Sequence, residues 1–253
     1  MPDLQIIFEN SKFLAVDKPA GVIVNRADTS KNFITLQDMI EQRYKISETP
    51  RVEDEAFIID GYNKFDEFVS RSGIVHRLDK ETSGIILVAK DPQTFLELQN
   101  QFKESLVKKK YIALVHGYVS DTEGEIDVPV ARLPWNRKRF GVHPEGREAK
   151  TQYKVLEIIK SKHENYSLLE VSPLTGRTHQ IRVHFQHIHH PIFADELYAG
   201  RKTARDERKI LSRHFLHAFQ ISFIDPETKN PIVLESPLPQ DLTNTIAILK
   251  KVD

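Results

Sequence analysis

The stretch HRLDKETSG at residues 76–84 lies between two apolar segments, GIV at residues 73–75 and IILV at residues 85–88. A connection between two strands usually needs only a short polar turn, yet this one carries five ionisable side chains. In extended backbone alternate residues share a face, so Arg77 and Asp79 point one way while Leu78 anchors the loop in the core. The loop is therefore either a cleft wall with two working charges or a surface turn with an incidental ion pair, and the local sequence favours the turn.

The bulk composition is that of a globular protein, with 40% apolar and 28% charged residues in a chain of 253. There is no cysteine, which excludes structural disulfides, thiolate catalysis, iron–sulfur clusters and cysteine-ligated zinc. No apolar stretch approaches the roughly 20 residues that span a bilayer, and the N-terminus lacks the regions of a signal peptide. We therefore expect a soluble, cytoplasmic protein.

The charges balance, with 36 basic and 36 acidic residues, which argues against strong nonspecific binding of polyanions. Their distribution is uneven, because residues 48–67 hold seven acids against two bases and residues 201–213 hold six bases against two acids. Residues 108–110 and 137–139 form two more basic spots. A single run of this kind is usually a solvated face. We expect residues 48–67 to form an acidic insertion or loop.

The pattern of apolar residues predicts more strands than helices. Strands are expected at residues 5–8, 13–16, 84–89, 111–119, 151–159, 166–171, 215–223 and 232–235. Helices are expected at residues 35–44, from Asp91 with an apolar stripe ending at Leu106, from Thr178 to Ile188, and at residues 242–249. Strands and helices do not alternate, which favours an α+β fold with a mixed, mostly antiparallel β-sheet core and flanking helices and loops. No linker-like stretch divides the chain, so one domain over residues 1–253 is expected.

A second polar motif is GRTHQIRVHFQH at residues 176–187. In a helix beginning at Thr178, Ile181 and Phe185 would form an apolar stripe, and His179 and Arg182 a separate polar one. A helix start with free backbone N–H groups beside Arg177 can bind an anion. The alternative is an ordinary amphipathic helix whose basic face meets solvent, and the sequence leaves both open.

Histidines cluster around the same motif, but a metal site is not expected there. His184 and His187 have a permissible spacing, yet no His-Glu-x-x-His pattern accompanies them. The sequence also lacks a Gly-x-Gly-x-x-Gly loop, a Walker-type loop and a Gly-x-Ser-x-Gly elbow. The usual signatures of nucleotide cofactors and serine hydrolases are therefore missing.

Taken together, six blocks of the chain resemble the RluA family of pseudouridine synthases. The two longest are GIVHRLDKETSGIILVAK at residues 73–90 and GRTHQIRVHFQHIHHPIFADELY at residues 176–198. The others, in the family's order, are VDKPAGVIV (16–24), KKKYIALVHG (108–117), EAKTQYKVL (148–156) and LHAFQISFIDPETKNPI (216–232). The resemblance implies the pseudouridine synthase fold, with an active-site cleft across the sheet. It also implies isomerisation of uridine in RNA, without a metal or an organic cofactor.

The resemblance also implies roles for individual residues. Asp79 would be the catalytic carboxylate, beside a ribose C1′ that becomes positive as the C1′–N1 bond breaks. Whether it bonds to the sugar or removes a proton is left open. Arg182 would pair with Asp79, and a neighbouring guanidinium typically lowers a carboxylate pKa by ~1–3 units. Tyr111 would stack on uracil and help to remove the C5 proton, and Arg77 would fill the space left by the flipped nucleotide.

The expected partner is RNA, as a tRNA or rRNA stem-loop with a flipped uridine. The residues expected to bind it are Arg77, His76, Arg177, His179 and Lys110. No membrane partner, no S4-type RNA-binding domain before Lys18 and a monomeric state are expected. Two positions depart from the family's usual glycines, His189 and Ala194.

Two other classes of function are weighed against an enzyme of this family. A non-catalytic RNA-binding or folding factor would be expected to have lost Asp79 or Arg182, and both are present. A glycosidase-like or metal-dependent hydrolase would need a second carboxylate block or metal-ligand spacing, and neither occurs.

Overall fold

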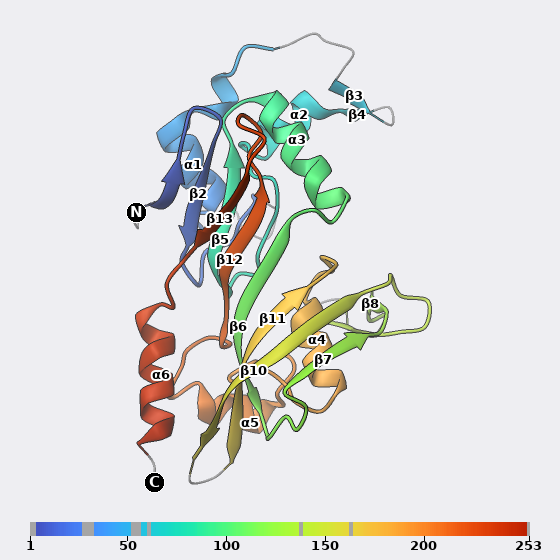
Figure 1. The fold of residues 1–253 in the computed structure, drawn as a ribbon, viewed down its shortest axis with the longest axis vertical. Helices are drawn as coiled ribbons and strands as arrows, with labels where there is room; N and C mark the ends of the chain where they lie inside the picture. The colour runs from blue at the N-terminus through green and yellow to red at the C-terminus, as the bar shows by residue number, and fades with distance from the viewer. Residues whose placement is uncertain are drawn as a thin grey trace. The chain divides into compact units, whose positions relative to one another are not determined.

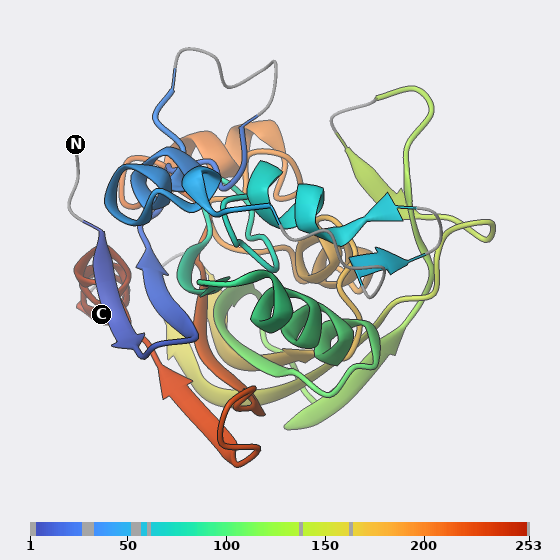
Figure 2. The same cartoon turned by 90° about the horizontal axis from the view of Figure 1, so that it is seen from above.

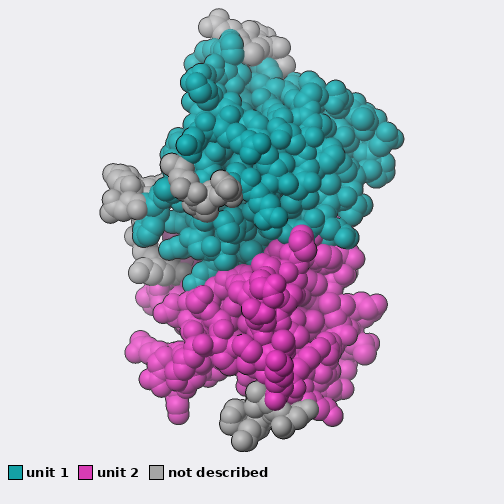
Figure 3. All heavy atoms as spheres, turned by 90° about the vertical axis from the view of Figure 1, so that its left-hand side faces the viewer, with its two compact units in different colours: residues 1–107, 220–236 teal, residues 108–219, 237–253 magenta. Residues whose placement is uncertain are grey.

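A computed structural model describes residues 4–26, 33–51, 57–59, 62–136, 139–161 and 164–251 of the chain. The chain divides into two compact units (Figure 3): unit 1 holds residues 1–107 and 220–236, and unit 2 holds residues 108–219 and 237–253. One domain over both units stays a prediction. Within the described residues, no helix has the length and apolar character that crossing a bilayer requires.

Unit 1 contains antiparallel strands and three α-helices among its described residues. Its elements are β1 (Gln5–Glu9), β2 (Phe13–Lys18), α1 (Leu36–Tyr44), η2 (Ile46–Glu48), β3 (Ile58–Ile59), β4 (Tyr62–Asn63), α2 (Lys64–Ser70), β5 (Ser83–Ala89), α3 (Pro92–Lys103) and β13 (Pro231–Glu235) (Figure 1). β2 pairs with β1 on one side, where the two lie side by side (Figure 2), and with β5 on the other. Every residue of β5 is buried, as its continuous apolar run predicts. In the β2–β5 register Lys18 lies opposite Gly84, where the charged loop ends.

The two longer helices of unit 1 begin where the sequence predicts. Thr35 and Asp38 form a capping box at the start of α1, and the Asp91 carboxylate accepts a hydrogen bond from the Thr94 N–H at 2.8 Å. The expected stripe to Leu106 is wrong, because α3 ends at Lys103 and Leu106 is 51% exposed. Ser105 takes a left-handed backbone with a φ of 59°, and the Leu106 N–H bonds to the Gln101 carbonyl at 2.9 Å. This is the Schellman arrangement that ends many helices.

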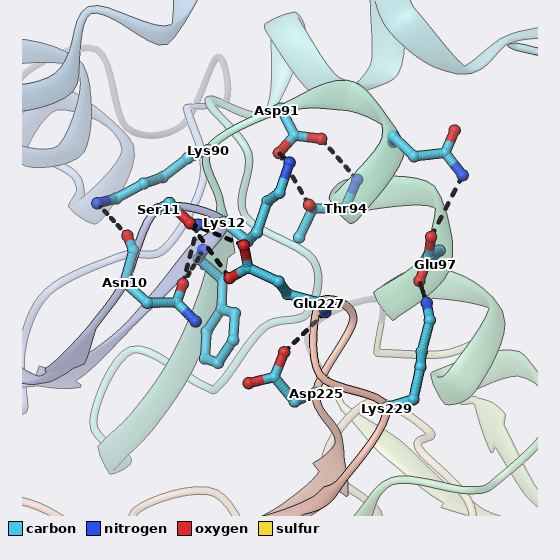
Figure 4. Close-up of polar contacts among 12 residues, drawn as sticks. Asn10, Ser11, Lys12, Lys90, Asp91, Thr94, Glu97, Asp225, Glu227 and Lys229 are labelled. Carbon is cyan, nitrogen blue, oxygen red and sulfur yellow. Dashed lines mark hydrogen bonds and ion pairs between the residues drawn. The ribbon is translucent and has the colours of Figure 1, made fainter.

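Polar contacts join three turns at one end of unit 1 (Figure 4). Lys90 of the turn before α3 donates to the Asn10 carbonyl at 2.6 Å, between β1 and β2. The Ser11 hydroxyl donates to Glu227, which follows β12, and Lys229 donates to Glu97 of α3 at 2.7 Å. The segment 220–236 is thereby fastened to the N-terminal part of the unit.

The acidic stretch at residues 48–67 is partly regular. Its described residues include the β3–β4 pair and the start of α2, whose Phe65 and Phe68 are buried. The apolar pattern did not predict α2, because two aromatic residues among charges give a weak periodic signal. Residues 52–56 and 60–61, with most of the acids, lie outside the described residues.

Unit 2 is built on the antiparallel strand order β6–β11–β10–β7. Its elements are β6 (Lys108–His116), β7 (Glu123–Asp127), β8 (Val130–Arg132), β9 (Phe140–Val142), β10 (Lys150–Lys160), β11 (Asn165–Pro173), α4 (Gln180–His187), α5 (Arg201–Glu207) and α6 (Gln240–Lys250). β12 (Leu216–Ile224) begins in unit 2 and ends in unit 1. Ile181 and Phe185 of α4 belong to the core of the unit. The α+β fold with mostly antiparallel pairing is confirmed.

Helix α4 differs from its prediction in two ways. It begins at Gln180, so Thr178 is not its cap, and the preceding His179 has a left-handed backbone with a φ of 56°. Gln180 to Phe185 are all buried, including Arg182 at 5% exposure. The interpretation as an ordinary amphipathic helix with a basic face in solvent is therefore wrong.

Candidate active site

The loop that carries Asp79 lies in unit 1 and enters β5 directly. Leu78 is buried, Arg77 is exposed and Asp79 is partly exposed, which is the alternation that extended backbone predicts. The Thr82 N–H bonds to the Asp79 carbonyl at 3.2 Å and closes the turn before the strand. The loop thus presents its two charges while Leu78 fixes it to the core.

A buried lysine supports this loop from the neighbouring strand. Lys18 has no exposed surface, and its Nζ donates to the carbonyls of Pro19, Val22 and Lys80 at 2.9, 2.9 and 3.2 Å. The Gly21 N–H also bonds to the Lys80 carbonyl, at 2.8 Å. An ammonium group without water needs such acceptors. The residue after Asp79 is therefore held by the VDKPAG segment, part of the block at residues 16–24 for which the sequence predicted no role in the site.

His76 fixes the start of the loop to β5. Its Nε2 accepts a hydrogen bond from the Leu87 N–H at 3.0 Å, so the ring proton of the neutral form is on Nδ1. The ring also lies 4.7 Å from that of Phe102, measured between centroids. In this structure His76 binds the backbone of β5. Its expected contact with RNA stays a prediction.

Arg182 of α4 is a buried charge with a bidentate partner. Its Nε and Nη2 donate to the two carboxylate oxygens of Asp195 at 2.7 and 2.9 Å, and Asp195 is fully buried. The guanidinium carbon lies 5.0 Å from the centre of the Tyr198 ring. Burial would raise the pKa of Asp195, but the hydrogen bonds and charge of Arg182 outweigh it, so the pKa lies below its usual value.

Asp195 was not among the site residues that the sequence predicted. Its Oδ1 also accepts hydrogen bonds from the N–H groups of Leu197 and Tyr198 at 3.0 and 3.2 Å. The signal was present in the block FADELY, where an acid follows an apolar segment, but spacing alone could not pair it with Arg182. Asp195 fixes the plane of the guanidinium, and a bidentate contact of this kind is directional.

The GRTH segment before α4 is organised by Gln180. Its Oε1 accepts from the Thr175 hydroxyl at 2.7 Å and from the Arg177 N–H at 2.9 Å, and its Nε2 donates to the Lys150 carbonyl at 3.0 Å. Arg177 donates through Nε to the Glu148 carbonyl at 2.9 Å, and the His179 Nδ1 lies 2.9 Å from the Tyr198 hydroxyl. These contacts override the capping that Thr178 would have provided.

Tyr111 and Lys110 are neighbours on β6. Tyr111 lies opposite Val171 of β11 and is partly buried against the core of unit 2. Lys110 forms an ion pair with Glu170 at 2.9 Å. At Lys109, burial first and the charge of Lys108 second lower the ammonium pKa. The basic spot at residues 108–110 is therefore only in part a solvated face.

The two departures from family glycines both occupy left-handed backbone. His189 has a φ of 64° and Ala194 a φ of 58°. This region costs a residue with a Cβ atom roughly 1–2 kcal/mol, and glycine avoids the cost. His189 and Ala194 thus hold a backbone conformation that glycine would adopt without strain.

The histidines of the GRTHQIR region hold backbone groups as well. His184 Nε2 lies 3.1 Å from the Val128 carbonyl and His190 Nδ1 lies 2.7 Å from the His116 carbonyl. Burial is the main reason that the pKa of His184 is lowered. Among the described residues, no group of three histidine, aspartate or glutamate side chains is placed to hold a metal ion.

The candidate residues divide between the two units. Unit 1 carries His76, Arg77 and Asp79, while the residues from β6 and the GRTHQIR segment belong to unit 2. Arg182, His179 and Tyr198 of unit 2 form one connected group. The expected Asp79–Arg182 pair joins residues of different units and stays a prediction.

Comparisons with known proteins agree with this fold and these motifs. The sequence model of the family described as RNA pseudouridylate synthase matches residues 12–187. The chain is 34% identical over 253 residues to the ribosomal large subunit pseudouridine synthase D of Nitrosomonas europaea, covering 98% of this chain and 66% of that protein. It is 35% identical over 254 residues to an uncharacterized RNA pseudouridine synthase of Aquifex aeolicus, covering 98% and 73%.

A solved structure shows the same fold. The human RNA pseudouridylate synthase domain containing 1 matches with a TM-score of 0.70 and 25% identity, over 94% of this chain and 84% of that one. This chain belongs to the RNA pseudouridylate synthase family, as its six blocks predict. It spans just under two thirds of the length of the Nitrosomonas europaea protein.

Proposed function

We propose that this protein converts specific uridines in structured RNA to pseudouridine. The observation that carries the proposal is the family match over residues 12–187, which contains Asp79, Tyr111 and Arg182 in the family's motifs. In the reaction the C1′–N1 bond breaks, the uracil turns, and a C1′–C5 bond forms. The proton on C5 is lost and N1 gains one, so product and substrate are isomers and no redox partner is needed.

The proposed roles follow the chemistry at C1′. The Asp79 carboxylate stabilises or attacks the sugar carbon as its bond to nitrogen breaks. Arg182 supplies the positive charge that keeps this carboxylate ionised away from bulk water. Its rigid pair with Asp195 supports this role, because a guanidinium already fixed in one plane loses little entropy when it binds a second carboxylate.

The remaining roles concern the base and the RNA chain. Tyr111 contacts the uracil ring and assists removal of the C5 proton. The exposed Arg77 enters the helix as the uridine flips out. Lys110, Arg177 and His179 contact the RNA around it, and His76 supports the loop that presents Arg77.

The proposed substrate is ribosomal RNA of the large subunit, with transfer RNA as the alternative. The name of the Nitrosomonas europaea relative favours ribosomal RNA. A folded stem-loop is favoured over a linear site because RNA is recognised through shape and through bases that leave the stack.

The test uses purified protein and large-subunit ribosomal RNA transcribed with uridine tritiated at C5. Release of tritium to water reports the reaction, because C5 loses its hydrogen only when C5 joins C1′. Asp79→Asn is expected to abolish release while RNA affinity stays within a few-fold. The matched control is Glu81→Gln, which neutralises the second carboxylate of the same loop and is expected to leave release intact.

The non-catalytic alternative predicts a different result. An RNA-binding factor would bind the transcript and release no tritium from any uridine, with or without Asp79. Pseudouridine still formed by Asp79→Asn on its cognate RNA would instead overturn the assignment of the catalytic carboxylate.

A further inference from the structure

The turn before Asp195 is clamped by two side chains near the end of α5. Glu207 Oε2 accepts from the Ala194 N–H at 2.7 Å, and Arg208 Nε donates to the Ala194 carbonyl at 3.1 Å. Both polar groups of this backbone position are thus held by side chains from one element. Ala194 is fully buried and has a left-handed backbone with a φ of 58°. The clamp therefore holds a conformation that an alanine resists by itself.

A buried charge network stands behind this clamp. Glu207 Oε1 lies 3.0 Å from His116 Nε2, and the other ring nitrogen of His116 lies 3.0 Å from Glu164. Glu207 and His116 are each about 8% exposed at the side chain. Two carboxylates on the two ring nitrogens favour the imidazolium, and its charge attracts the Glu207 carboxylate at close range.

The clamp adjoins the residue that orients Arg182. Asp195 follows Ala194 directly, and its carboxylate holds the Arg182 guanidinium through two hydrogen bonds of 2.7 and 2.9 Å. A rotation of the Ala194 peptide would turn the Asp195 side chain and tilt the guanidinium plane. The chain of contacts runs from His116 through Glu207 and Ala194 to Asp195 and Arg182.

We propose that Glu207, supported by His116, is a positioning residue for Arg182, acting through the left-handed turn at Ala194. The inference rests on the proposed function, in which Arg182 supports the catalytic carboxylate. Glycine would adopt the backbone conformation of residue 194 without strain. Because this chain has an alanine there, the hydrogen bonds of Glu207 and Arg208 hold the turn in place.

The experiment compares Glu207→Ala, Ala194→Gly and the double variant in the full chain. Glu207→Ala is expected to lower kcat by roughly 10- to 100-fold with KM for RNA unchanged, because small misplacements of a working group cost this much. Glu207→Gln keeps an oxygen for the Ala194 N–H and is expected to lose less. Adding Ala194→Gly to Glu207→Ala is expected to restore most of the lost turnover, because glycine needs no clamp at this φ.

The control separates positioning from general loss of stability. Asp241→Ala removes the carboxylate that binds Arg213 at 2.6 and 3.0 Å in the same unit. It is expected to lower Tm without changing kcat at temperatures where the protein stays folded. Equal kcat losses in Glu207→Ala and Asp241→Ala, or no restoration by Ala194→Gly, would overturn the proposal.

A second readout does not depend on activity. The Nε–H resonance of Arg182 in a ¹⁵N NMR spectrum, assigned by its loss in Arg182→Lys, is expected to shift in Glu207→Ala and to return in the double variant. An unmoved resonance would refute the positioning role. Restoration of the resonance in a protein that modifies no RNA would leave the positioning intact and reject the proposed function instead.

Discussion

At the scale of single residues, the Arg182–Asp195 pair is the feature with the clearest energetic consequence. Arg182→Ala leaves the Asp195 carboxylate buried and without its guanidinium, which we expect to destabilise the protein by about 3–5 kcal/mol and to abolish turnover. Arg182→Lys keeps the charge but loses the bidentate geometry, so a smaller loss is expected. The free energy of unfolding, measured by urea denaturation, is compared among variants that share the same denaturant slope. A stability unchanged in Arg182→Ala would contradict the role of the pair.

At the scale of elements, α5 presents an exposed cationic face whose use we expect to be RNA binding. Its buried side carries Ala204 and Glu207, while Arg201, Lys202 and Arg205 are exposed. Among the described residues, no ion pair involves Arg201 or Lys202. The helix was missed from sequence because five of its seven residues are charged and they leave no apolar stripe.

Neutralising this face tests its role. Arg201→Ala with Lys202→Ala is expected to weaken RNA binding and to reduce the slope of log affinity against log salt by about 2, or about 1 for each lost phosphate contact. The control is Lys154→Ala with Lys250→Ala, two exposed cations already paired with Glu123 and Glu157. Binding titrations over a range of salt decide it, and equal slopes for both double variants would show that α5 does not contact RNA.

The contact between β6 and α5 makes stability depend on pH. Burial opposes the charge on His116, but Glu207 and then Glu164 outweigh it, so the His116 pKa is raised above 6.5. A raised pKa in the folded state means that the contribution is complete below about pH 6.5 and is lost as pH rises through the folded value. The free energy of unfolding is therefore expected to fall over that window, and His116→Gln is expected to remove this part of the decline. An identical pH profile in the variant would contradict the assignment.

At the scale of the whole molecule, the expected outcome is loss of pseudouridine at a defined site. Deleting the gene and mapping pseudouridine across total RNA is expected to show a missing signal in large-subunit ribosomal RNA, which the intact gene restores and the Asp79→Asn gene does not. A missing signal confined to transfer RNA would correct the proposed substrate. An unchanged map in the deletion strain would argue against the proposed reaction in the cell.

The amino-acid sequence by itself was enough to predict the family, the α+β class and most of the helices and strands. The continuous apolar run at residues 84–89 predicted a buried strand, and Asp91 followed by proline predicted a helix start; both are present as β5 and α3. Ordered blocks of sequence also identified Asp79 and Arg182 as the residues to examine. These are local patterns, and they depend on a residue and its near neighbours.

Only the tertiary structure decided what holds those residues in place. Lys18 lies 62 positions before Lys80, and His116 lies 91 positions before Glu207, so no periodicity could pair them. The structure also showed that the side chains of Glu207 and Arg208 hold the left-handed turn at Ala194. A buried polar group needs a hydrogen-bond partner. Which partner it finds depends on how segments distant in the sequence pack together, and short-range sequence patterns do not encode that packing.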